Sequence, residues 1–170
     1  MVLAVIKKRR SVRKYQSRLV EPEKIKEILR AGMYSPSARH IRGWQFIVVD
    51  DEKIIKKLAD TKMYAQHLAA ASVVIAVVSE EYKYWLENAS IVAHQMTLEV
   101  VNQGLSTCWT QIYDSQRLDG SSAEEYVKQV LKIPQKMRVL CLLGIGYPGE
   151  DLPEHDDTEF EKAKIHKNQW

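Results

Sequence analysis

The stretch that most constrains the fold is residues 84–103, a helical pattern with apolar side chains on more than one side. One face collects the following apolar residues: Trp85, Ala89, Val92, Ala93, Met96 and Val100. A second face carries Ile91, Leu98 and Val101. A helix that is apolar on more than one side has to be buried on more than one side. In a chain this short, the pattern predicts a core helix or a helix in a subunit interface, ending at Gly104.

The other patterns predict a helix-rich chain with about four strands, in an order that is not a regular βαβ alternation. Strands are expected at 44–49, 73–78, 105–110 and 137–143, and helices at 22–33, 51–59 and 123–131. The run VVIAVV at 73–78 is apolar on both faces, as in a central strand covered on both sides. No GxGxxG motif follows a strand, which argues against a Rossmann dinucleotide site. The glycines of GIGYPG at 144–149 are expected to form a turn after the last strand.

Length, charge and cysteine content narrow the class of protein. The 170 residues suit a single domain over 1–170, and the net charge of +3 is below the excess that a dedicated nucleic-acid binder carries. No stretch approaches the ~20 apolar residues of a membrane-spanning helix. The start, MVLAVIKKRR, places apolar residues before charges, opposite to a secretory signal. Cys108 and Cys141 form no CxxC pair, so we expect no metal site, no disulfide framework and a reducing cytoplasm.

Positive charge is concentrated in KKRRSVRKY at 7–15, where six of the nine residues are Lys or Arg. A nucleic-acid backbone, a membrane surface and a small-molecule phosphate are the candidate partners. Arginine forks contact phosphate oxygens at two points, and the hydroxyl of Ser11 adds a donor. No aromatic-rich basic platform occurs elsewhere, which speaks against a nucleic acid. Taken alone, such a run is also typical of a solvated charged face.

Two further polar stretches are candidate site segments, SPSARHIRGWQF at 35–46 and GLSTCWTQ at 104–111. The first is a stiff, non-helical segment between a helix and a strand, with hydroxyl donors, His40, Arg42 and Trp44. The second follows the long helix and enters a strand, where backbone amides can point at a ligand. Each also fits a plain surface loop or a helix-to-strand junction. We find no Ser-His-Asp or Cys-His arrangement that would supply a protein nucleophile.

In this order, the motifs resemble those of the FMN-dependent nitroreductase family over nearly the whole chain. The matching motifs are RRSVR at 9–13, PSA at 36–38 with Trp44, GLSTCW at 104–109, GIGYP at 144–148 and HKNQW at 166–170. The resemblance implies an α+β fold with a central, mostly antiparallel sheet of about four strands flanked by helices. It further implies an intertwined homodimer with FMN at the interface, residues 150–170 as a C-terminal arm, and a strand that a partner can donate.

The resemblance also implies roles for the basic run. Arg9 and Ser11 are expected to bind the FMN phosphate, with Arg10 at the phosphate or the ribityl chain. Arg13 is expected at the pyrimidine edge of the flavin. A fixed cation there stabilises the negative charge that two-electron reduction places near N1 and O2.

The remaining implied contacts lie in the other two polar segments. They are Pro36, Ser37 and Ala38 from the partner subunit, with His40 beside them, and the backbone of Thr110, Gln111 and Ile112 facing the flavin N5. In two respects the chain departs from the family. His40, Arg42 and Gly43 stand where the family often has Asn, Gln and Pro, and the 150–170 tail is acidic where many members carry a basic residue.

The implied reaction is ping-pong: NAD(P)H gives a hydride to N5, then a nitroaromatic, quinone or related acceptor is reduced at the same place. The short span 59–72 leaves no room for a large lid, which favours a small open site. Two alternatives stay open, a flavin-binding redox protein without turnover and a basic nucleic-acid-binding module. No ribose-reading motif distinguishes NADH from NADPH.

Overall fold

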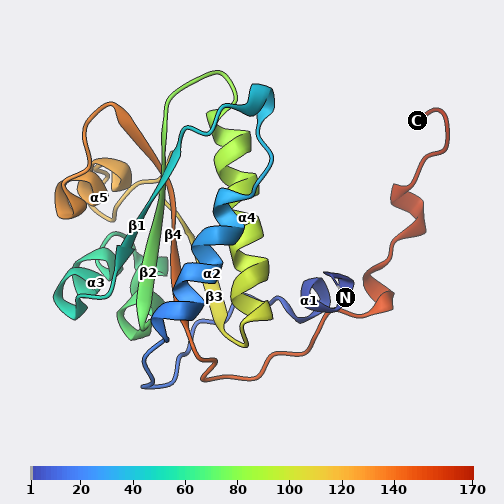
Figure 1. Ribbon diagram of the computed structural model, residues 1–170, viewed down its shortest axis with the longest axis horizontal. Helices are drawn as coiled ribbons and strands as arrows, with labels where there is room; N and C mark the ends of the chain where they lie inside the picture. Colours follow the sequence, from blue (N-terminus) through green and yellow to red (C-terminus); the bar gives the residue numbers. More distant parts are fainter. Residues whose placement is uncertain (1) are drawn as a thin grey trace.

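A computed structural model describes residues 2–170 and contains a four-stranded antiparallel sheet (Figure 1). The strands are β1 (Trp44–Val49), β2 (Val73–Glu80), β3 (Ser106–Gln111) and β4 (Met137–Gly146), in the order β1-β2-β4-β3. The central pair is therefore β2 and β4, and the edges are β1 and β3. The α+β fold and the antiparallel sheet expected from the sequence are confirmed.

Helices cover both faces of the sheet. On one face lie α2 (Pro22–Met33) and α4 (Trp85–Asn102). On the other lie α3 (Glu52–Ala59), α5 (Ala123–Leu131) and the 3₁₀ segment η2 (Met63–Ala70). The alternating side chains of β2 divide between these two layers: Val73, Ile75 and Val77 pack with α2 and α4, and Val74, Ala76 and Val78 pack with α3, η2 and α5.

Local signals explain where three of the helices begin. Pro22 is the first residue of α2, a position that needs no backbone donor. Asp51 caps α3, since its Oδ1 accepts from the N–H groups of Lys53 and Ile54 at 2.8 and 3.0 Å. Ser122 caps α5 in the same way. No helix among residues 2–170 is both long and apolar enough to cross a bilayer.

The long helix α4 is buried on one face only within this chain. Its first apolar face lies in the core against the sheet. On the second face, Ile91 is 45% exposed and Leu98 and Val101 are half-buried. A cavity of about 450 Å³ lies there between α4, α2 and the short N-terminal helix α1 (Val2–Lys8). The second apolar face of α4 is thus only partly covered by residues 2–170.

The last strand is longer than the sequence pattern indicated. Gly144 pairs with Val74 on one side and with Cys108 on the other, and Gly146 pairs with Ser106. The turn predicted over 144–149 is therefore wrong for 144–146, which are ladder residues of β4. Segments α1 and η2 also have no counterpart among the predicted elements, because neither has a regular apolar period.

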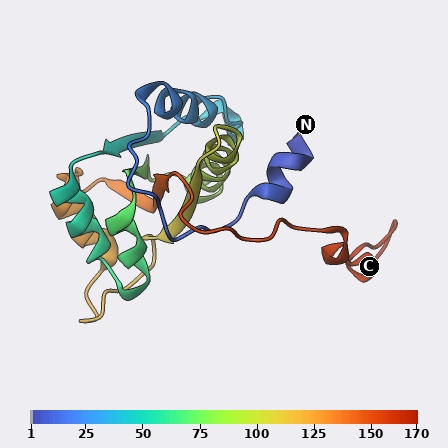
Figure 2. The same cartoon turned by 90° about the horizontal axis from the view of Figure 1, so that it is seen from below.

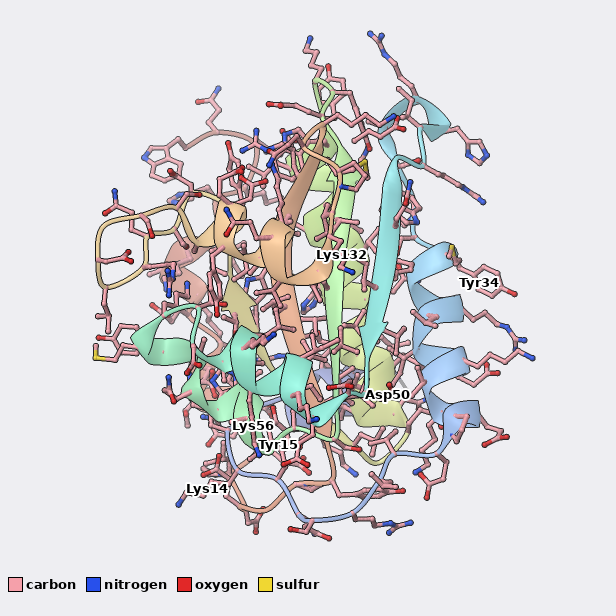
Figure 3. The ribbon with its side chains drawn as sticks, turned by 90° about the vertical axis from the view of Figure 1, so that its left-hand side faces the viewer. Lys14, Tyr15, Tyr34, Asp50, Lys56 and Lys132 are labelled. Carbon is pink, nitrogen blue, oxygen red and sulfur yellow. The ribbon has the colours of Figure 1, made fainter. Side chains whose placement is uncertain are left out.

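Glycines in β4 and just after it make room for Tyr15. A Cβ added at Gly146 would lie 2.9 Å from Cδ1 of the Tyr15 ring. One at Gly149 would lie 2.9 Å from the Tyr15 carbonyl carbon. The phenol donates to Gly144 O at 3.0 Å, and burial raises the pKa of Tyr15 well above its ordinary value. Figure 3 shows Tyr15 at the same end of the molecule as Asp50, which follows β1.

The two ends of the chain run beside each other outside the sheet. The N–H of Gly149 donates to Lys14 O at 2.8 Å, and the N–H of His155 donates to Lys7 O at 2.9 Å. Beyond this, residues 156–170 are exposed and extend away from the body, on the side where α1 also projects (Figure 2). The description of 150–170 as an arm that crosses to a partner stays a prediction.

The fit of Tyr15 to Gly146 can be tested by a double-mutant cycle. We expect Gly146→Ala to lower the free energy of unfolding by ~1–3 kcal/mol, because the added methyl collides with the ring. In a Tyr15→Ala background the same change should cost clearly less, since the two closest ring atoms are gone and only the Cβ of residue 15, at 3.2 Å, remains near the added methyl. Urea unfolding of the four proteins measures both steps. An equal cost in the two backgrounds would show that the glycine serves something other than Tyr15.

Candidate functional site

The basic segment is held along the open edge of β3. Ser11 forms a parallel bridge with Thr107, and the N–H of Val12 donates to Thr107 O at 3.3 Å. Val12 is buried, whereas Arg13 is exposed. The segment therefore acts as a short additional strand whose polar side chains stay at the surface. The hydroxyl of Thr107 is buried without a hydrogen-bond partner.

A cavity of about 510 Å³ lies where this segment, the second half of β3 and η2 meet. The residues that line it are Arg13, Lys62, Met63, Tyr64, Gln66, His67, Cys108, Trp109, Thr110 and Gln111. None of these described residues is acidic, while Arg13 and Lys62 are cationic. The cavity is thus suited to an anionic or electron-rich ligand.

The arginines of the run differ in their partners. Arg13 donates from its guanidinium to Ser11 O at 3.2 Å and borders the cavity. Arg10 donates to Pro153 O in the tail, and Arg9 is half-buried. Burial raises the pKa of the Cys108 thiol, and the charges of Arg13 and Arg9 oppose that rise. Both arginines therefore act on the same end of β3.

An acidic side chain meets the run from the tail. Oε1 of Glu150 accepts from the N–H groups of Arg13 and Lys14 at 2.7 and 3.3 Å. These bonds hold the pKa of Glu150 below its ordinary value. The tail thus fixes the backbone of the run through Glu150, which uses the N–H groups of Arg13 and Lys14 and not the Arg13 guanidinium. Further along, Lys7 pairs with Asp157 at 2.7 Å.

The backbone at the end of β3 faces the cavity edge. The N–H of Ile112 donates to Leu140 O at 3.0 Å. Because hydrogen-bonded pairs alternate along an antiparallel ladder, Gln111, opposite Cys141, is a non-hydrogen-bonded position. Its N–H and C=O therefore point away from β4. Of the three residues expected here, Thr110 and Gln111 line the cavity, while Ile112 is fully buried in the core and its N–H is already used.

Segment η2 supplies cavity residues that the sequence reasoning missed. The Nδ1 of His67 lies 3.0 Å from Tyr64 O, and its Nε2 lies 3.3 Å from the Thr110 hydroxyl. Burial lowers the pKa of His67. Lys62 contacts Gln111 O and lies 3.3 Å from Ser115 Oγ. The available signal was a polar lysine and histidine inside an otherwise apolar run before β2.

The segment 36–40 does not join these residues within one chain. It precedes β1, which is the opposite edge of the sheet from β3. The N–H of Ala38 donates to Asn88 Oδ1 at 3.0 Å, and the hydroxyl of Ser37 is buried without a partner. Arg39 and His40 both have left-handed backbone angles, with φ of 56° and 57°. Such a strained pair is uncommon and is found at binding segments.

Comparison with known proteins identifies the family to which this architecture belongs. The model of the nitroreductase family matches residues 6–71 and 59–147. A protein of Archaeoglobus fulgidus, provisionally assigned as an NADH dehydrogenase/NAD(P)H nitroreductase, is 30% identical over 175 residues, 99% of this chain and 98% of the relative.

Solved structures agree with the family match. The FMN-dependent nitroreductase of Clostridium difficile R20291 superposes with a TM-score of 0.95 at 34% identity, covering 99% of each chain. The NADPH:FMN oxidoreductase of Vibrio harveyi, solved with NAD+, has a TM-score of 0.79 over 99% of this chain and 77% of its own, and at 19% identity shows the fold alone. Because the family match spans most of the chain and the relatives align from end to end, the chain belongs to the nitroreductase family of oxidoreductases.

Proposed function

We propose that this protein is an FMN-dependent oxidoreductase that takes a hydride from NAD(P)H and passes it to nitroaromatics, quinones or related acceptors. One observation carries the proposal. The basic segment is fixed along β3, so that Arg13 and the Gln111 N–H border one cavity without acidic lining, with Arg9 and Arg10 a few residues earlier on the same segment. Family membership and the FMN-dependent relative support the same cofactor.

The residues present fit FMN. An anionic phosphate needs cationic forks and hydroxyl donors, which Arg9, Arg10 and Ser11 offer on one short segment. A flavin ring needs a cation and backbone donors at its polar edge, which Arg13 and Gln111 offer at the cavity. FMN, when bound, supplies the hydride acceptor and donor that the side chains lack.

Arg13 and the β3 edge have separate tasks in this scheme. Arg13 holds positive charge at the cavity mouth, where it favours a ligand that gains negative charge. Thr110 and Gln111 form a flat wall that orients the ring. Because one open cavity receives both NAD(P)H and the acceptor, the two bind in turn, and ping-pong kinetics follow.

The complete site requires a homodimer in this proposal. The second apolar face of α4, with Ile91 45% exposed, is what a subunit interface would cover. A partner would bring its Pro36, Ser37, Ala38 and His40 to the cavity, since the same segment of one chain lies at the opposite edge of the sheet from β3. Residues 150–170 are the candidate arm, and the outer edge of β1 can accept a donated strand.

The tail does not offer a clear basic phosphate contact. Among its lysines, Lys164 pairs with Glu161, and both Lys162 and Lys164 are exposed beyond the contact with α1. The phosphate would therefore depend on Arg9, Arg10 and Ser11. Cys108 and Cys141 are free and buried. The cytoplasmic location stays a prediction. The absence of nucleic-acid binding is also a prediction.

Reduction of the bound cofactor tests the function directly. We expect the purified protein, incubated with FMN and freed of excess, to show flavin absorbance bands that bleach when NADH or NADPH is added without oxygen. A nitroaromatic or quinone should then restore the bands. Bands that persist with both donors would point to a flavin binder without this turnover. No bands at all would refute the proposal and favour the nucleic-acid alternative.

The phosphate assignment can be tested by removing two charges. We expect Arg9→Ala with Arg10→Ala to raise the dissociation constant for FMN about 100-fold, because two charge-assisted contacts are lost. The free energy of unfolding should change by less than ~1 kcal/mol, since both arginines are only half-buried and neither forms an ion pair among residues 2–170. The matched control is Lys26→Ala with Arg30→Ala on α2, which removes the same charge away from the site. Equal FMN affinity in the two double variants would disprove the assignment.

A further inference from the structure

The cavity wall contains a lysine to which the proposed function assigns no task. Lys62 precedes η2, and its ammonium group donates to Gln111 O and to Ser115 Oγ, the latter at 3.3 Å. The side chain is half-buried and borders the cavity. Lys62 thus links η2 to the end of β3 at the point where the backbone edge is open.

The charge on Lys62 has no acidic partner among the described residues. Both of its hydrogen-bond acceptors are neutral, and no carboxylate lies within 4 Å of its nitrogen. Burial lowers the pKa of Lys62 accordingly. The other basic groups on the cavity are Arg13 and His67, and the lining includes no Asp or Glu. An unpaired, partly desolvated cation acts strongly on whatever enters such a cavity.

The peptide that Lys62 contacts is fixed at both ends. Its carbonyl, Gln111 O, accepts from Lys62, and its N–H, on Ile112, donates to Leu140 O at 3.0 Å. The preceding N–H, on Gln111, remains directed toward the open edge of β3. Without Lys62, the carbonyl would have no described donor, and the peptide could rotate about its remaining bond.

We propose that Lys62 is a positioning and charge-supplying residue of the flavin site. It fixes the Gln111–Ile112 peptide against the cavity, and its positive charge makes the site bind reduced, anionic flavin more tightly than oxidised flavin. The inference rests on the proposed function. It differs from a purely structural tether between η2 and β3, because a tether would affect stability and leave the relative affinity for the two redox states unchanged.

The test compares the midpoint potential of bound FMN in Lys62→Met, Lys62→Arg and the wild type. In Lys62→Met, the affinity for reduced over oxidised FMN should fall about tenfold, a shift of ~30 mV to lower potential for a two-electron couple. Lys62→Arg should keep most of the wild-type value because the charge remains. The matched control is Lys136→Met, which removes an exposed lysine before β4, and should leave the potential unchanged.

The possible outcomes separate the inference from the proposed function. A Lys62→Met protein with the wild-type potential would overturn the inference, even if its melting temperature fell. If Lys62→Met does not fold, Lys62→Gln keeps a donor to Gln111 O without the charge, and its potential should fall in the same direction. A wild-type protein that binds no FMN would overturn the proposed function itself, and the inference with it.

Discussion

The position of the basic run depends on the packing of the Tyr15 ring against β4. The Tyr15 ring packs against β4 at Gly146, and its hydroxyl donates to Gly144 O. Gly149 lies close to the backbone of Tyr15. A side chain at these glycines would remove the space. The packing of Tyr15 adds to the bridge between Ser11 and Thr107, and together these contacts hold the residues before Tyr15 at the edge of β3. The basic run at 7–15, whose like charges repel one another, is thereby held in one place.

Fixing the run determines the electrostatics of the cavity. Arg13 lies on the basic run and Lys62 precedes η2, and both border the cavity. The carboxylate of Glu150, in the tail, accepts from the backbone N–H groups of Arg13 and Lys14. Cations on a partly desolvated wall favour electron-rich ligands. The same edge leaves the Gln111 N–H directed away from β4, while Gln111 O accepts from Lys62. Charge and a backbone donor therefore converge on one cavity.

Helices and strands with strong apolar periodicity were predictable from the sequence, and segments without such periodicity were not. The helices at 22–33 and 123–131 and the strand at 44–49 have the predicted bounds. The two apolar faces of α4 were readable, but what covers the outer one was not. Segment η2 has no period, so Lys62 and His67 went unnoticed, and the glycines of β4 resembled a turn because their partner, Tyr15, lies far away in the chain. The backbone contact expected at Ile112 stays a prediction, and its N–H is already bonded to Leu140 O, which sequence alone cannot reveal.

The most direct test of the account is a crystal structure of the protein with FMN. It predicts a dimer in which the phosphate lies within hydrogen-bond distance of Arg9 and Ser11, and the ring lies against Gln111 in the cavity between β3 and η2. The partner's segment 36–40 should complete the wall. FMN bound away from the β3 edge, or a phosphate held without either Arg9 or Ser11, would contradict the account.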